Sequence, residues 1–470
     1  MILLYTPSTG FPDLEVKIAY GLARVGIESG INFEITPQAG FYIINFETNS
    51  LDKIHETLLM LLKRLLTSNR FYELGVKAKD KGKYTADEET IKKISKNLNF
   101  ASIYSPRTII NLNFKKDTFC GHEELPKFGG RTGLILLSSF HAGKPYERDK
   151  RFSTFNQSLC SVCGYLAVLG LYSFGFIIQL GTGKNKKYVL VLPLPKKTLN
   201  KESFIRLLSL QKTLHNFWLS NILPLRTFTI GLLAKVPSLC EIVNELELSF
   251  YLMMLSKDNR GDTAVEQNSL VETFPFSRFI AQSSYNSATV EKLLGSVRKD
   301  DLPKITTLLE LVELIENRSK DSLLKFPRLY VQETSPKNGS YVNLLYPETA
   351  KYLLKEVAMI SQNIIENPSL SSLAKTLRYF IRERKYGYAD DIRNAREDSR
   401  DFEETIAKML REGRLRLEQK EMIHLPTDSE IQEVFRLANQ DFEATKTALV
   451  ILAFSFPSGT KEEVIETTEG

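Results

Sequence analysis

The sequence predicts an α+β fold, with a mixed N-terminal α/β region that carries a zinc-knuckle insertion and a helical C-terminal domain. Three observations support this prediction. β-rich runs alternate with helical periodicity near the N-terminus, closely spaced Cys and His residues occupy the middle, and amphipathic helical patterns dominate after residue 347. The chain has 470 residues, 43% hydrophobic and 25% charged, which is ordinary globular composition with room for several domains.

We predict five segments along the chain. They are an α+β domain at 1–104, a basic, zinc-binding, nucleic-acid-facing region at 105–200, a mixed and mostly helical domain at 201–346, a helical bundle at 347–456, and a disordered acidic tail at 457–470.

The N-terminal elements follow from simple patterns. MILLYT predicts a buried strand, and Asp13 is a candidate cap for a helix over about 14–26. NFEITPQAGFYIINFE (32–47) predicts two strands joined by a Gly-containing turn, and 51–69 has apolar residues at helical spacing. This order of strand, helix, hairpin and helix predicts an α+β domain.

The middle of the chain holds the most apolar stretch, residues 164–183. Its Gly and Tyr content, Gln179 and a following Lys cluster favour a buried helix and a strand over a membrane span. Residues 175–195 predict a hairpin with a Lys-rich turn. The opening residues show no signal peptide, so we predict a cytoplasmic protein without a disulfide scaffold.

The later elements are mostly helical. KITTLLELVELIENR (304–318) predicts an amphipathic helix, and Thr427 with Glu430 predicts a capping box. We expect an exposed loop at 257–269, a hairpin at 329–346, and a helix followed by a wing-like hairpin at 409–426. The near-balanced charges in RYFIRERKYGYADDIRNAREDSR predict a salt-bridged helical surface.

Four residues form the strongest candidate site. Cys160 and Cys163 make a C-x2-C pair, and Cys120 and His122 lie two residues apart upstream. Three of the four cysteines and one of the five histidines fall in these two clusters, which predicts a tetrahedral zinc site. His141 is a spare candidate for the fourth ligand.

Two alternatives to zinc remain open for these residues. One is a set of buried thiols with an unrelated histidine, and the other is a redox C-x-x-C, which the lack of a thioredoxin-like context disfavours. The fourth cysteine, Cys240, fits a core position.

A structural role suits the predicted zinc better than a catalytic one. Zinc deaminases need H-x-E or C-x-E with P-C-x-x-C, whereas here two glutamates follow His122 directly and Ser-Leu precedes Cys160. Four protein ligands also leave no open coordination position. The sequence contains no G-x-S-x-G or H-E-x-x-H motif, so we predict a protein that binds rather than catalyses.

Positive charge is concentrated in one segment. Residues 105–220 hold 17 Lys and Arg against 6 Asp and Glu, a net +11, so the rest of the chain carries −5 of the total +6. Such asymmetry indicates a surface that meets a polyanion. The candidate nucleic-acid-binding residues are Lys144, Arg148, Lys150, Arg151, Lys184, Lys186, Lys187, Lys196 and Lys197.

The stretch LGTGKNKK (180–187) is a Lys-rich hairpin tip and not a nucleotide-binding loop. Asn185 stands where a Walker A motif needs Ser or Thr, and a strand follows instead of a helix. Taken alone, the tip is better explained as a solvated turn. The neighbouring basic clusters and interleaved aromatic residues favour contact with phosphates and bases.

The opening MILLYTPSTGFPDLEVKIAYGLARVG, the CSVCG knuckle after a C-x-H pair and the helical C-terminal region together resemble the large subunit of type I CRISPR interference (Cascade) complexes, type I-A in particular. The resemblance covers the chain in outline, and the opening is its most specific part. His122 departs from relatives that carry a second C-x2-C pair.

The resemblance implies a non-catalytic subunit of a crRNA-guided complex. It implies contact with the crRNA 5′ handle and double-stranded target DNA, reading of the protospacer-adjacent motif, packing against other CRISPR effector subunits, and recruitment of a helicase–nuclease, with no membrane partner. Two other classes stay open: a zinc-dependent enzyme that processes nucleic acid, and an assembly protein that makes no nucleic-acid contact.

Overall fold

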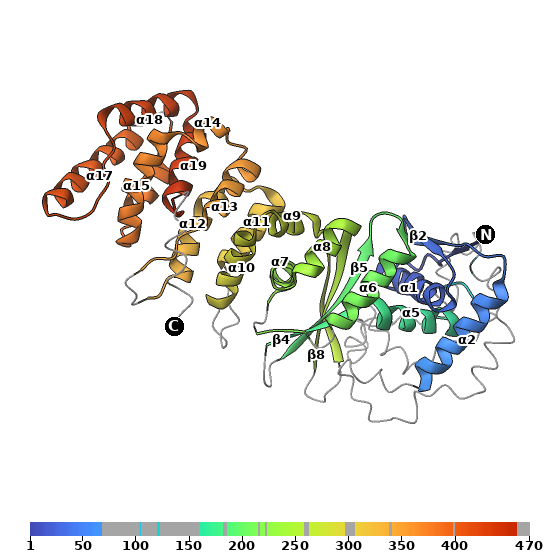
Figure 1. Cartoon of the computed structure of the whole chain (residues 1–470). Coiled ribbons are helices and arrows are strands. Elements are labelled where there is room, and N and C mark those ends of the chain that lie inside the picture. Colours follow the sequence, from blue (N-terminus) through green and yellow to red (C-terminus); the bar gives the residue numbers. More distant parts are fainter. Residues whose placement is uncertain are drawn as a thin grey trace, which may run out of the picture. The chain divides into compact units, whose positions relative to one another are not determined.

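A computed structural model gives the fold of the chain. It describes residues 1–67, 104, 120–122, 159–181, 186–214, 217–220, 223–257, 263–296, 306–337, 341–397 and 400–457. The chain divides into two compact units, residues 1–225 with 241–274 and residues 226–240 with 275–470 (Figure 1). Both sheets lie in the first unit and the second is helical, which confirms the predicted α+β fold with a helical C-terminal region. The division into five segments stays a prediction.

A four-stranded antiparallel sheet forms from the N-terminal residues, in the order β1-β3-β2-β6. Its strands are β1 (Ile2–Tyr5), β2 (Phe33–Gln38), β3 (Phe41–Phe46) and β6 (Leu199–Asn200). Tyr42, Ile44 and Phe46 alternate into the core along β3. The predicted strand and hairpin are therefore confirmed.

Helices α1 (Pro12–Ser29) and α5 (Ser161–Phe174) pack closely against each other in the first unit (Figure 1). Glycines allow this approach: a Cβ on Gly170 would lie 2.0 Å from the carbonyl oxygen of Lys17, and one on Gly21 would lie 2.2 Å from that of Leu166. Nearly every residue of α5 is buried, as the prediction of a buried helix followed by a strand requires. Among the described helices, none has the length and apolarity to cross a membrane.

The start of α1 differs from its prediction. Asp13 does not cap the helix, because Pro12 already occupies the first turn and Asp13 lies inside it. The Asp13 carboxylate instead pairs with the Lys17 ammonium group at 3.0 Å, with both side chains fully buried.

A second sheet has the order β7-β4-β5-β8-β9. Its strands are β4 (Phe176–Leu180), β5 (Lys187–Pro195), β7 (Trp218–Leu219), β8 (Leu248–Lys257) and β9 (Thr263–Val271). The predicted hairpin of β4 and β5 is confirmed. The expected loop at 257–269 is wrong in its second part, because β9 pairs with β8 along its length and this pairing satisfies the backbone of a polar sequence.

The remaining helices are α2 (Leu51–Thr67), α6 (Lys201–Thr213), α7 (Leu225–Lys235), α8 (Pro237–Leu246), α9 (Phe274–Gln282), α10 (Ser284–Ser296), α11 (Thr306–Asn317), α12 (Lys320–Thr334), α13 (Pro347–Tyr352), the π-helical turn η8 (Leu353–Val357), α14 (Gln362–Ile365), α15 (Pro368–Arg382), α16 (Gly387–Asn394), α17 (Asp401–Glu418), α18 (Asp428–Gln440) and α19 (Phe442–Ala453). The predicted helix at 304–318 corresponds to α11.

Two hairpins expected near the C-terminus are wrong. Residues 329–334 belong to α12, because Leu323, Phe326 and Tyr330 bury one helical face and this packing outweighs the local β propensity. The wing-like hairpin is absent, since α17 continues to Glu418, residues 419–420 form a turn and residues 421–427 contain no strand.

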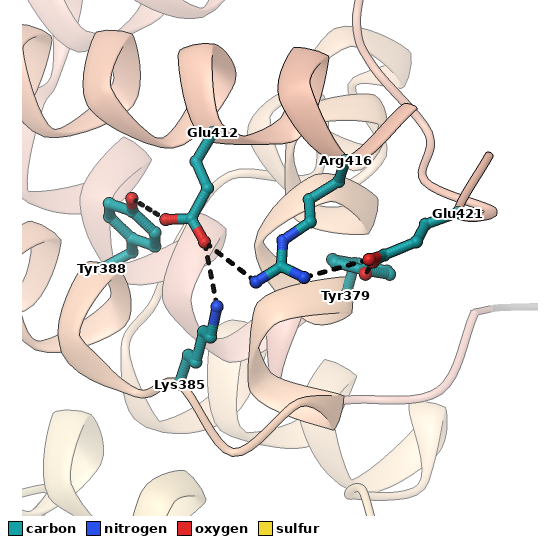
Figure 2. Close-up of polar contacts among 6 residues, drawn as sticks. All are labelled: Tyr379, Lys385, Tyr388, Glu412, Arg416 and Glu421. Carbon is teal, nitrogen blue, oxygen red and sulfur yellow. Dashed lines mark hydrogen bonds and ion pairs between the residues drawn. The ribbon is translucent and has the colours of Figure 1, made fainter. Parts of the chain in front are cut away.

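Predicted polar features of the second unit are confirmed. The Thr427 hydroxyl and the Glu430 carboxylate satisfy each other's backbone N–H groups at the start of α18, which makes the capping box. A salt-bridged surface joins α15, α16 and α17, as Figure 2 shows. Its members are Tyr379, Lys385, Tyr388, Glu412, Arg416 and Glu421.

Glu412 is central to this salt-bridged surface. Its carboxylate accepts hydrogen bonds from the Tyr388 hydroxyl at 2.5 Å and from the Lys385 ammonium group at 3.0 Å, and it lies 3.6 Å from Arg416 (Figure 2). These two hydrogen bonds lower the pKa of Glu412, and the one from Tyr388 has the larger effect. The second terminal nitrogen of the Arg416 guanidinium donates to the Glu421 carboxylate at 3.0 Å. The network therefore connects the last turns of α17 to the neighbouring helices.

Candidate metal centre

Four buried side chains from two distant segments meet at one point in the first unit. They are Cys120, His122, Cys160 and Cys163, and their potential ligand atoms all lie within 4.8 Å of one another. Each is at most 9% exposed. The structure therefore brings together all four residues that the sequence predicts as ligands.

Local backbone geometry aims each pair at the same centre. Gly121 has a φ of +69°, in the left-handed region that glycine adopts readily, and it forms the turn between Cys120 and His122. Cys160 is the N-cap of α5, and Cys163 lies in the first turn of that helix. The Cys163 backbone N–H donates to the Cys160 Sγ at 3.4 Å, as expected for a tight knuckle.

The spacing fits a tetrahedral metal ion. His122 Nδ1 lies 3.4 Å from the Sγ atoms of both Cys160 and Cys163. Ligands at the usual zinc distances would place a nitrogen and a sulfur about 3.6 Å apart across a tetrahedral edge. The four side chains are thus close enough to bind a metal ion, and three sulfurs with one imidazole nitrogen are a common donor set for zinc.

The cluster without a cation cannot readily hold three thiolates. Burial raises the pKa values of the Cys160 and Cys163 thiols well above the ordinary value. Burial also opposes ionisation of Cys120, but its hydrogen bonds to the other two cysteines and to His122 outweigh burial and lower its pKa. A bound cation would stabilise all three thiolates, so metal binding and ionisation of the cluster are coupled.

The α5 N-terminus adds to this stabilisation. The helix macrodipole places partial positive charge beside Cys160 and Cys163, which favours their ionised forms. If all four side chains bound one tetrahedral ion, they would fill its coordination shell and leave no position for water or substrate.

Tyr104 borders the cluster and was missed by sequence reasoning. Its hydroxyl lies 3.4 Å from Cys163 Sγ, and its ring packs edge-on against the His122 ring at 5.8 Å between centroids. Tyr104 is fully buried. No spacing rule marks this residue, because it lies 16 residues before the first ligand and only the fold brings it close.

Of the two other candidates from the sequence, the structure describes one. Cys240 is buried, and its Sγ donates to the carbonyl oxygen of Ser277, which confirms its predicted core position. His141, the spare ligand, lies outside the described residues.

The predicted nucleic-acid-binding residues divide into two groups. Four of them lie within the described residues: Lys186, Lys187, Lys196 and Lys197. The other five lie outside the described residues: Lys144, Arg148, Lys150, Arg151 and Lys184.

Three of the four described lysines pair with glutamates of the same unit. Lys187 contacts Glu266 at 2.7 Å, Lys197 contacts Glu247 at 2.8 Å, and Lys196 contacts Glu272. All of these side chains are more than a quarter exposed, and such surface pairs contribute only about 0–1 kcal/mol. A polyanion could therefore displace the glutamates at little cost.

We compared the chain with protein-family models and with curated proteins. No protein-family model matches the chain, and no curated protein matches it either.

Proposed function

We propose that this chain is a non-catalytic, zinc-stabilised, nucleic-acid-binding subunit of a crRNA-guided CRISPR effector complex. In that role it contacts the crRNA 5′ handle and duplex target DNA, reads the protospacer-adjacent motif and helps recruit the helicase–nuclease. In this role the protein acts in the cytoplasm. The observation that supports this proposal most strongly is the set of four buried Cys and His side chains that lie close enough to bind one metal ion, in the segment of the sequence with the net positive charge.

The donor set supports structural zinc rather than catalytic metal. Three thiolates and an imidazole suit zinc, whereas magnesium and calcium prefer oxygen ligands. A catalytic zinc needs an open position, and four converging protein donors would fill the tetrahedron. When bound, the ion would supply cross-linking energy to the fold.

The position of the ligands in the sequence supports a binding role. The two ligand pairs bracket residues 123–159, so one ion would hold both ends of this 37-residue stretch together. Four predicted phosphate contacts, Lys144, Arg148, Lys150 and Arg151, lie within it. The potential metal ligands therefore flank, in the sequence, a segment that contains four of the predicted phosphate contacts.

The sequence resemblance supplies the CRISPR part of the proposal. The opening that carries it builds β1 and α1, and α1 packs against the helix that presents Cys160 and Cys163. The resembling elements and the metal ligands thus belong to one folded unit.

Duplex binding at several salt concentrations tests the proposal. Fluorescence anisotropy would compare the full chain with a variant that has Ala at Lys184, Lys186 and Lys187. Log affinity falls with log salt concentration, and each lost phosphate contact makes this negative slope shallower by about 0.9. We expect the triple variant to bind more weakly and its slope to be shallower by about 2 to 3.

A matched control removes the same charge elsewhere, through Ala at Lys53, Lys63 and Lys325. If both variants lost the same duplex affinity, the loss would reflect net charge alone, and the hairpin tip would not be a specific binding site. Metal-dependent cleavage of nucleic acid by the isolated chain would favour a zinc-dependent enzyme instead. Absence of binding to duplex DNA and to crRNA-handle RNA would favour an assembly protein.

A further inference from the structure

Each cysteine sulfur of the candidate metal centre lies within hydrogen-bond distance of a donor. The Cys160 backbone N–H donates to Cys120 Sγ at 3.3 Å, and the Cys163 backbone N–H donates to Cys160 Sγ at 3.4 Å. The Tyr104 hydroxyl lies 3.4 Å from Cys163 Sγ. Apart from the contacts among the four ligand side chains themselves, each sulfur thus has a donor among the described residues: a backbone N–H for Cys120 and Cys160, and the Tyr104 hydroxyl for Cys163.

The charge of the centre explains why these donors matter. One divalent cation with three thiolates and a neutral imidazole would carry a net charge of −1, and all four of these side chains are buried. A buried charge is costly unless hydrogen bonds or dipoles offset it. The two backbone donors and the α5 N-terminus offset part of the charge, and a hydrogen bond to an anionic acceptor is stronger than one between neutral groups.

Tyr104 can only act as the donor to an ionised Cys163. The phenol is fully buried beside Cys163 Sγ, and a thiolate has no proton to donate, so the hydrogen atom of this contact must come from the phenol. Its backbone carbonyl accepts a hydrogen bond from the Tyr5 N–H at 2.8 Å, at the end of β1. Its ring packs against His122, so one residue touches two ligands and the N-terminal sheet.

We infer that Tyr104 is a positioning residue of the metal centre, whose hydroxyl stabilises the metal-bound Cys163 thiolate and whose backbone couples the centre to β1. This inference depends on the zinc site of the proposed function. Outer hydrogen bonds of this kind typically change metal affinity about 10- to 100-fold.

Tyr104→Phe tests the inference, because it removes the hydroxyl and keeps the ring. Zinc affinity would be measured by competition with a chromogenic chelator, and the cobalt-substituted protein would report the sulfur-to-metal charge-transfer band. We expect one zinc per chain in both proteins, about 10- to 100-fold weaker binding in the variant, and a shifted charge-transfer band.

Tyr20→Phe is the matched control. The Tyr20 hydroxyl is also buried in the first unit, but it donates to the carbonyl oxygen of Pro193 and not to the cluster. We expect this control to lose stability while its zinc affinity and cobalt spectrum stay unchanged.

The outcomes are distinguishable. Zinc affinity of Tyr104→Phe within twofold of the parent, or an equal loss in Tyr20→Phe, would overturn the role of Tyr104. Absence of zinc from the parent protein would instead refute the metal centre itself, and with it the proposed function.

Discussion

Replacement of Gly170 by Ala should disrupt both the first unit and its metal centre. The new Cβ would lie 2.0 Å from the Lys17 carbonyl oxygen and 2.7 Å from the Gly21 nitrogen, whereas real Cβ contacts essentially never fall below 3.0 Å. The obstacle is backbone on a packed helix, so α1 and α5 must separate by at least about 1 Å. Overpacking typically costs about 1–3 kcal/mol, and a rigid obstacle favours the upper end.

A loss of about 3 kcal/mol corresponds to a fall of about 6–12 °C in the melting temperature of a unit of this size. Because Cys160 is the N-cap of α5 and Cys163 lies in its first turn, displacement of the helix also moves these two ligands, so zinc should pass more rapidly to a chelator. Thermal unfolding and chelator challenge would measure the two effects in the same samples.

Gly295→Ala is the control for this change. Gly295 lies in α10, and a Cβ there meets nothing within 4 Å, so the substitution should be neutral or stabilising by up to about 1 kcal/mol. Unchanged melting and zinc retention in Gly170→Ala would refute the close packing of α1 and α5 on which the reasoning depends.

Three other predictions follow. Cys163→Ser should abolish zinc binding and lower the melting temperature, whereas Cys240→Ser should retain zinc, by elemental analysis of both proteins. Glu412→Gln should cost about 1 kcal/mol at pH 7 in urea unfolding. Because folding lowers the pKa of Glu412, its contribution is present above the unfolded value of about 4.3 and is lost as pH falls through the folded value, so the difference between Glu412→Gln and the parent should vanish in acid. Thr427→Ala should cost about 1 kcal/mol and Thr427→Ser much less, by the same unfolding assay.

Prediction from sequence succeeded where local chemistry determines the structure. The spacing of Cys120 with His122 and of Cys160 with Cys163 identified all four clustered residues, because few residue types supply soft metal ligands. The Thr427 capping box was likewise predictable, because both of its partners lie within one helical turn.

Prediction failed where distant packing decides the local conformation. The β-rich sequence around Tyr330 is helical because that face is buried against other helices, and β9 is a strand because β8 pairs with it. Neither neighbour is visible in a local window of sequence. Tyr104 was missed for the same reason, since only the fold brings its hydroxyl to Cys163.

The salt-bridged surface around Glu412 shows an intermediate case. Balanced charges predicted ion pairing in general, and the structure supplies the particular partners on α16 and α17 (Figure 2). Sequence could not assign these pairs, because several equally spaced charges compete for each partner.

The decisive measurement for a zinc-stabilised, DNA-binding protein is the zinc content of the full chain, purified without added metal. We expect one zinc per chain by elemental analysis, and removal of that zinc should unfold the region around α5 and weaken binding to duplex DNA. A chain that contains no zinc, or one that keeps its stability and DNA affinity after the metal is stripped, would contradict the account.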